Sequence, residues 1–231
     1  MERQDKLSFK EWFENIWYHY KWPIILLGFI VIFLIGGIIQ SITRHDPDVS
    51  FMYIGAATVT VDGTNELEST VEEIIDDYNG DEYKKVDYLE FTALTDNSNN
   101  VIFDADHNKK VLQRFFVEIA AGDSIIYLVD DYYYNMLLGK EQLDVCVLAK
   151  LSDVLDDADM PVNALDEYGV FIKDLDIYKT EGFNQLPEST ILCIRRSPEQ
   201  DEVKYGRTMD VYNNNKKCFI KLITYKAPQE D

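Results

Sequence analysis

An uncharged stretch of 22 residues, Trp22–Thr43, constrains the fold of this chain more than any other feature. At ~1.5 Å of rise per residue it forms about 33 Å of helix, which matches a bilayer hydrocarbon core of about 30 Å. Lys21 and Arg44 flank it, and residues 24–39 are all Ile, Leu, Val, Phe or Gly. A buried helix of a soluble protein would need protein around every face. We therefore predict a transmembrane helix over Trp22–Thr43, with the lipid bilayer as its partner.

Basic residues are distributed unequally on the two sides of this stretch. Arg3, Lys6, Lys10 and Lys21 precede it, and within the next ~20 residues only Arg44 follows it. The positive-inside bias predicts a cytoplasmic N-terminus and a large extracytoplasmic domain on the cell membrane. A cleaved signal peptide is the alternative, but its apolar region usually has ~7–15 residues and a small-residue cleavage site. The sequence favours an uncleaved signal anchor.

Residues 1–21 carry an amphipathic pattern of their own. Ser8 and Glu11 have the spacing of a helix capping box. After them apolar side chains recur at three- and four-residue intervals: Trp12, Phe13, Ile16, Trp17 and Tyr20. Trp and Tyr beside a span favour the lipid headgroup region, so we predict a helix on the cytoplasmic membrane surface. A helix that binds a partner protein remains the alternative.

The acidic residues are concentrated after the apolar stretch. Residues 1–45 hold five basic and four acidic residues, so the other 17 basic and 38 acidic residues give residues 46–231 a net charge of −21. This charge repels phosphate backbones, which excludes nucleic acid as an expected partner, and it favours encounters with cations. A solubilising acidic surface is the simpler explanation of the same composition.

Few residues of this chain could support catalysis or bind a metal. There are three cysteines, without a C-x-x-C pair, and His107 is the only histidine after residue 45. Cys193 and Cys218 lie in apolar, strand-like runs, where buried thiols are the default and a single disulfide is the alternative. No nucleophile, zinc or phosphate-binding motif is found. We predict no enzyme activity, no cofactor and no metal site.

Strand and helix patterns alternate in the first half of the acidic region. Strands are predicted at 49–55 and 86–94, with a second short strand at 58–61, and a buried strand is predicted at 124–129. Helices are predicted at 64–78 and 107–121, ending at Asn79-Gly80 and at Gly122. This order predicts right-handed βαβ units in an α/β fold with a mostly parallel, three-layer arrangement.

The second half has weaker patterns. Helices are predicted at 132–138 and 144–155, strands at 169–175 and 190–195, and a further β-prone segment at 217–225. About 185 residues suffice for one domain with a core. The predicted organisation is a cytoplasmic segment (1–21), a transmembrane helix (22–43), a linker (44–48), a single extracytoplasmic α/β domain (49–225) and a disordered tail (226–231).

Part of this order resembles the N-terminal lobe of extracytoplasmic solute-binding proteins of ABC importers. The resemblance covers roughly residues 49–155 and includes SFMYIG, VDYLEFTAL and the segment from Leu112 to Leu143. Ala120-Ala121-Gly122-Asp123-Ser124 and Gly139–Leu143 match its motifs, whereas Ile125 and Ile126 replace the usual Pro-Asp. The resemblance implies the fold of one lobe. The chain is too short for the two lobes and hinge with which such proteins close around a ligand.

Open α/β sheets bind ligands at the carboxyl ends of their parallel strands. In this chain those positions define a candidate ligand cleft: Tyr53, Gly55, Thr95, Asp96, Asp130, Asp131, Tyr132 and Tyr133. Aromatic rings beside carboxylates suit a small cation or a sugar. The simpler explanation is that Asp130 or Asp131 caps a helix and the tyrosines pack in the core.

Two functions agree with these patterns. The first is a membrane-anchored, non-catalytic binding or interaction module with a solute-binding-like lobe. The alternative is a structural or assembly subunit of a membrane or cell-envelope complex, with a membrane or envelope protein as partner. An exposed apolar patch on the acidic domain would favour the alternative.

Overall fold

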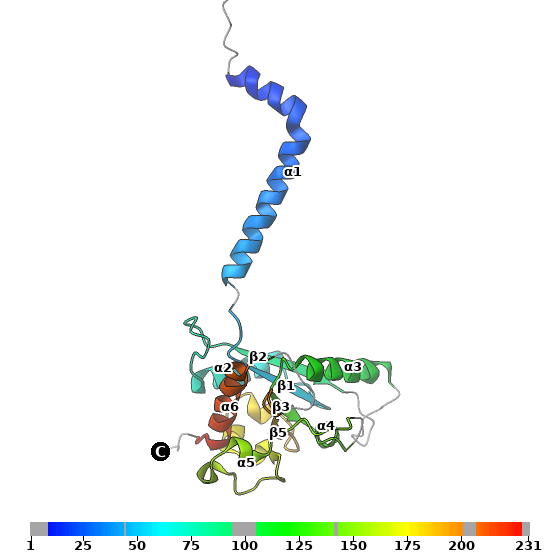
Figure 1. The fold of residues 1–231 in the computed structure, drawn as a ribbon, viewed down its shortest axis with the longest axis vertical. Coiled ribbons are helices and arrows are strands. Elements are labelled where there is room, and N and C mark those ends of the chain that lie inside the picture. The colour runs from blue at the N-terminus through cyan, green and yellow to red at the C-terminus, as the bar shows by residue number, and fades with distance from the viewer. Residues whose placement is uncertain (1–8, 44, 94–104, 141–142, 201–206, 228–231) are drawn as a thin grey trace, which may run out of the picture. The chain divides into compact units, whose positions relative to one another are not determined.

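The computed structural model describes residues 9–43, 45–93, 105–140, 143–200 and 207–227. The chain divides into two compact units, Met1–His45 and Asp46–Asp231. The first unit contains the helix α1 (Phe9–Thr43) and the second is an α/β domain (Figure 1).

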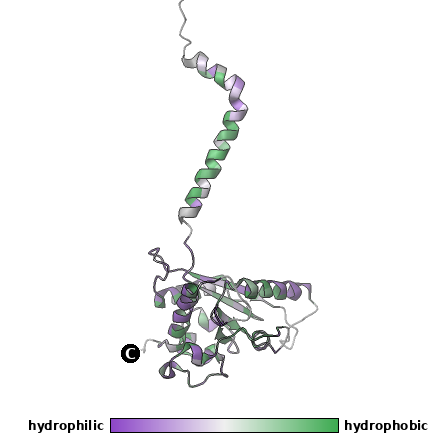
Figure 2. Cartoon of the chain, in the orientation of Figure 1, coloured by the Kyte–Doolittle hydropathy of each residue, from purple (hydrophilic) through white to green (hydrophobic). Residues whose placement is uncertain are grey.

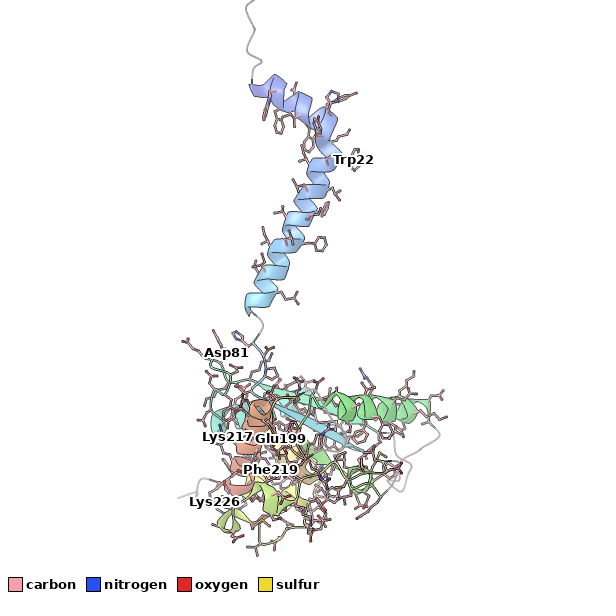
Figure 3. The ribbon with its side chains drawn as sticks, viewed as in Figure 1. Trp22, Asp81, Glu199, Lys217, Phe219 and Lys226 are labelled. Atoms are coloured by element: carbon pink, nitrogen blue, oxygen red, sulfur yellow. The ribbon has the colours of Figure 1, made fainter. Side chains whose placement is uncertain are left out.

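Helix α1 is continuous through the predicted amphipathic segment and the predicted span. It contains Pro23, which cannot donate a backbone hydrogen bond, and it bends near Trp22 (Figures 1 and 3). The section Ile16–Gln40 is long and apolar enough to cross a membrane, and none of it is buried by the protein. Figure 2 shows this section as mostly hydrophobic. The predicted helix of spanning length is confirmed; the predicted cap, Ser8, lies outside the described residues.

One mixed sheet forms the centre of the domain, with the strand order β2-β1-β3-β5-β4. The strands are β1 (Val49–Gly55), β2 (Val86–Thr92), β3 (Ile126–Val129), β4 (Gly169–Phe171) and β5 (Ile191–Ile194). β1 pairs in parallel with β2 and β3, whereas β5 pairs antiparallel with β3 and β4. The predicted α/β class is confirmed, but the sheet is mixed, and the parallel prediction holds only for β1, β2 and β3. No long helix lies between β4 and β5, both fully described, to make a parallel crossover.

Helices cover both faces of the sheet, which gives three layers. The α-helices of the domain are α2 (Val61–Ile74), α3 (Asp106–Ala121), α4 (Asp131–Leu137), α5 (Leu151–Val154) and α6 (Met209–Thr224). Short 3₁₀ helices are η1 (Asp157–Asp159), η2 (Ile172–Asp174), η3 (Asp176–Lys179) and η4 (Phe183–Gln185). One core contains side chains of α2 and α6, and the other contains side chains of α3 and α4.

Strand β1 contributes to both cores because successive side chains of a strand point to opposite faces. Phe51 and Tyr53 pack with α2 and α6, while Met52 and Ile54 pack with α3 and α4. All four side chains are at most 1% exposed. Burial on both faces explains why the sequence of β1 is almost continuously apolar.

The predicted short strand at 58–61 is wrong. Helix α2 already begins at Val61, and the Thr60 hydroxyl accepts a hydrogen bond from Gly63 N at 3.0 Å. A threonine that caps a helix supplies the first turn with an acceptor that a strand would not use. The helix also ends earlier than predicted, at Ile74, and residues 75–85 form a loop.

Two predictions for the second half are also wrong. Residues 144–155 are mostly extended, because Ala149 N donates to Ile194 O and Arg196 N donates to Val147 O; only α5 is helical. Residues 217–225 belong to the helix α6 rather than to a strand. Its buried side chains follow helical spacing: Tyr212, Asn215, Cys218, Phe219, Leu222 and Ile223. The strands predicted at 86–94, 124–129 and 190–195 and the helices at 107–121 and 132–138 are confirmed within a few residues.

Cys193 and Cys218 are both free and fully buried. Cys193 belongs to the core beside α3 and α4, whereas Cys218 belongs to the core beside α6, so the sheet separates them. The alternative of a disulfide between them is therefore wrong. Burial raises the pKa of both thiols, which makes them poor nucleophiles.

The amino end of β1 is attached to the loop 75–85 through Asp48. This carboxylate is only 4% exposed. One oxygen accepts hydrogen bonds from Tyr78 N at 2.7 Å and Asn79 N at 3.0 Å, and the other accepts from Lys85 N at 3.0 Å. Three backbone donors therefore compensate for the lost hydration of one charged group. The tail residues 228–231 lie outside the described part of the chain.

Candidate functional site

The carboxyl ends of β1 and β3 form a topological switch point. Helix α2 follows β1 and packs on one face of the sheet, whereas α4 follows β3 and packs on the opposite face. The chain thus turns to opposite sides after β1 and after β3. Ligands of open α/β sheets bind at such a point. We use the name strand-end site for three residues at this edge, Tyr53, Glu90 and Asp130.

Tyr53 lies at the centre of the strand-end site, close to the end of β1. Its ring is 1% exposed, and its hydroxyl accepts a hydrogen bond from Ala57 N at 3.2 Å. Burial, together with the charges of Asp130 and Glu90, raises the pKa of Tyr53 to about 12. Gly55 makes room for this ring, because a Cβ atom there would lie 2.6 Å from the hydroxyl oxygen.

Glu90 is adjacent to Tyr53 on the neighbouring strand β2, in direct register. Its carboxylate accepts a hydrogen bond from the Thr92 hydroxyl at 2.8 Å. The Thr58 hydroxyl in turn donates to Thr92 Oγ1 at 3.3 Å. These bonds orient the Glu90 carboxylate and leave it half-exposed.

Asp130 follows β3 and is the N-cap of α4. Its backbone N–H donates to Ile54 O at 3.2 Å, and its carboxylate accepts from Tyr133 N at 3.1 Å. Burial raises the pKa of Asp130 to about 6, although the hydrogen bonds from the backbone of Tyr133 and Tyr132 oppose that shift. A carboxyl group with a pKa this far from its ordinary value is typical of functional sites.

The other predicted site residues are distributed differently. Tyr133 is 2% exposed and packs with its ring centroid 5.5 Å from that of Phe115, so it is a core residue. Tyr132 is half-exposed and contacts Tyr133, and Asp131 is exposed on the first turn of α4. Thr95 and Asp96 lie outside the described residues. The structure thus brings Tyr53, Gly55 and Asp130 together at one edge and places Tyr133 in the core.

Two carboxylates face one tyrosine in this site without a compensating cation. In the described part of the chain neither Asp130 nor Glu90 forms an ion pair. The described residues also contain no group of three His, Cys, Asp or Glu side chains positioned to hold a metal ion. Carboxylates without such a partner suit an organic ammonium group, which their negative charge attracts.

Three residues of this region were not predicted from the sequence: Thr58, Glu90 and Thr92. A signal for Glu90 was present, because it occupies an inward position of a strand whose other inward residues include Val86 and Tyr88. A carboxylate in an apolar row of a strand departs from the alternating pattern. That departure could have identified it.

Two of the cavities in the described part of the domain lie elsewhere. One, of about 530 Å³, lies between η1, η2 and the end of α6 and is lined by Asp159, Asp174 and Lys226, among others. The other, of about 610 Å³, lies between β2 and α3. Neither includes Tyr53, Glu90 or Asp130.

Comparisons of this chain with protein-family models, with curated proteins and with solved structures found no match.

Proposed function

We propose that this protein is a membrane-anchored, non-catalytic binding protein whose domain takes a small organic cation at the strand-end site. The observation that carries the proposal is the pair of half-buried carboxylates around Tyr53 that no described cation neutralises. Removing charges from water is costly unless they are compensated, so a bound ammonium group would restore the balance.

The anchor is part of the same proposal. Helix α1 has the length and apolar character of a span, and the excess of Lys and Arg before it favours a cytoplasmic N-terminus. The domain would then be extracytoplasmic. The chain enters the domain at the amino end of β1, the opposite end of the strand from Gly55.

The domain is proposed to be a single lobe of the solute-binding kind. The parallel order β2-β1-β3 with helices on both faces supports this assignment, and the motif Ala120–Ser124 lies at the predicted turn between α3 and β3. A single lobe binds a ligand on its surface and has no second lobe to close over it.

The test is titration of the full chain in detergent micelles with putrescine, spermidine and choline, and with glucose as a neutral probe, followed by calorimetry. We expect at least one amine to bind at pH 8 and to bind about tenfold more weakly to Asp130→Asn or Glu90→Gln. Asp153→Asn, which removes the same charge from an exposed position on α5, is the matched control. Binding of glucose alone, or amine binding that is equal in all variants, would refute a cation site.

A further inference from the structure

A second surface of the domain lies on the opposite face of the sheet, in the cavity of about 610 Å³ between β2 and α3. We call it the β2–α3 groove. Its apolar lining comes from Leu89 and Phe91 of β2 and from Val111 and Val117 of α3. Val117 is 69% exposed, although it lies beside the buried row of α3. The groove is thus an exposed apolar surface at the edge of the sheet.

Cations line one side of this groove. Lys110 and Arg114 are four residues apart, so both lie on the groove face of α3. Among the described residues neither forms an ion pair, whereas the neighbouring Lys109 lies 3.8 Å from Asp106. Glu118, the one carboxylate among the described residues that line the groove, accepts hydrogen bonds from Ser124 N and Oγ at 2.9 and 2.8 Å. Two cations without an acidic partner among the described residues therefore lie beside apolar surface, and the net charge of residues 46–231 is −21.

The backbone of β2 is partly free at the same edge. The groups that point away from β1 belong to every second residue. Val86 N donates to a Glu72 carboxylate oxygen at 3.4 Å, the backbone of Tyr88 is bonded to Glu68, and His107 Nε2 lies 2.8 Å from Thr92 O. Between Tyr88 and Thr92, the backbone groups of β2 that point away from β1 are the N–H and C=O of Glu90. These two groups have no partner among the described residues.

We propose that the β2–α3 groove binds an acidic, extended polypeptide segment of a partner protein. An apolar side chain of the segment packs on Phe91 and Val117, carboxylates pair with Lys110 and Arg114, and the backbone bonds to Glu90. Exposed sheet edges bind peptides in this way, with main-chain hydrogen bonds for affinity and side-chain pockets for specificity. This inference does not depend on a ligand at the strand-end site.

The charges argue against a second copy of this chain as the occupant. If the β2 edges of two copies paired antiparallel around a two-fold axis, the face of one sheet that carries α3 would lie beside the same face of the other sheet. The cations of α3, Lys110 and Arg114, would approach those of the other copy. Like charges directly opposite one another destabilise such a pairing.

The test uses the full chain in detergent micelles and a short fluorescent peptide of alternating valine and glutamate, with a valine–lysine peptide of equal length as the opposite-charge probe. We expect the acidic peptide to raise fluorescence anisotropy and the basic one to leave it unchanged. Lys110→Glu with Arg114→Glu should weaken binding at least about tenfold. Lys109→Glu with Lys84→Glu, the same charge change at exposed positions outside the groove, should leave it within about twofold.

Two further measurements identify the mode of binding. Hydrogen exchange of the Glu90 amide should slow when the acidic peptide is bound, and Val117→Ser should weaken the peptide without changing the thermal unfolding temperature. Vesicles of phosphatidylcholine with phosphatidylglycerol serve as the lipid probe. If these vesicles bind through Lys110 and Arg114 while the peptide does not, or if both charge-reversed variants bind the peptide equally, the proposal of a polypeptide partner is wrong.

Discussion

Acidic side chains lie at both ends of the parallel strands, and their surroundings differ. At the amino end, Asp48 is 4% exposed and accepts three backbone hydrogen bonds. At the carboxyl end, Asp130 and Glu90 are half-exposed. Asp130 accepts hydrogen bonds from the backbone of Tyr133 and Tyr132, and Glu90 accepts one from the Thr92 hydroxyl. The burial of Asp130 is compensated so incompletely that its pKa is raised to about 6. At the amino end the carboxylate stabilises the fold. At the carboxyl end the two carboxylates keep a charge that the proposed cation would neutralise.

The largest effect on the free energy of unfolding is expected at the amino end of β1. Asp48→Ala removes the acceptor of three backbone N–H groups in a buried position, and each unsatisfied donor costs about 1 kcal/mol or more. We expect the free energy of unfolding to fall by about 3 kcal/mol, measured by urea unfolding of the full chain in micelles.

Asp87→Asn, at an exposed position of β2, is the control for Asp48 and should change the free energy of unfolding by less than about 0.5 kcal/mol. Equal effects of Asp48→Ala and Asp87→Asn would show that the hydrogen bonds of Asp48 do not stabilise the domain.

A smaller effect is expected for Gly55→Ala. The new Cβ atom would lie 2.6 Å from the Tyr53 hydroxyl, and the ring cannot move freely because it is buried. Overpacking of this kind costs about 1–3 kcal/mol. Adding Tyr53→Phe removes the clashing oxygen, so the double variant should recover about half of the loss. Strict additivity of the two substitutions would contradict this account of Gly55.

The smallest effect on stability is expected for Asp130→Asn, which should stabilise the domain. Because the folded state raises the pKa of Asp130 from 3.8 to about 6, the folded chain binds more protons than the unfolded chain between these values. The contribution of Asp130 to stability is therefore most favourable below about pH 4 and is lost as the pH rises through about 6. Asparagine caps a helix as well as aspartate does. Asp130→Asn should stabilise the domain by about 1 kcal/mol at pH 8 and leave it unchanged at pH 4.

The same variant sharpens the functional comparison. A substitution that stabilises the fold and weakens amine binding would identify Asp130 as a residue kept for binding. Denaturant midpoints at both pH values, together with calorimetry at pH 8, measure the two quantities. A destabilised Asp130→Asn at pH 8 would instead place Asp130 with Asp48, as a structural carboxylate.

The sequence predicted correctly those helices and strands whose hydrophobic pattern coincides with a start or stop signal. The continuously apolar β1, the helix α3 that ends at Gly122, and β3 followed by a capped α4 each combine a pattern with a start or stop signal. The residues after Asp144 lack such agreement. In residues 144–150 the apolar side chains pair with the end of β5 across a separation of some 50 residues, and local patterns do not contain that information.

Helix α6 was misassigned for a related reason. Its apolar half, residues 217–225, is rich in residues that favour strands, and Asn213–Asn215 at its start are weak helix formers. The helical spacing appears only when Tyr212 and Asn215 are counted with Phe219. For the candidate site, Tyr53, Gly55 and Asp130 could be predicted because they lie near the ends of predicted strands. Glu90 could be placed there only once β2 was known to pair with β1.

The helix α6 packs on the first strand of the domain. Asn215, which is 1% exposed, accepts a hydrogen bond from Ser50 N at 3.0 Å. Phe219, labelled in Figure 3, belongs to the same core as Phe51. A chain that emerges from the ribosome in order exposes β1 long before α6 has been synthesised. The apolar face of β1 must therefore be kept from aggregating until about 160 further residues have been translated, which predicts a need for chaperones during biogenesis.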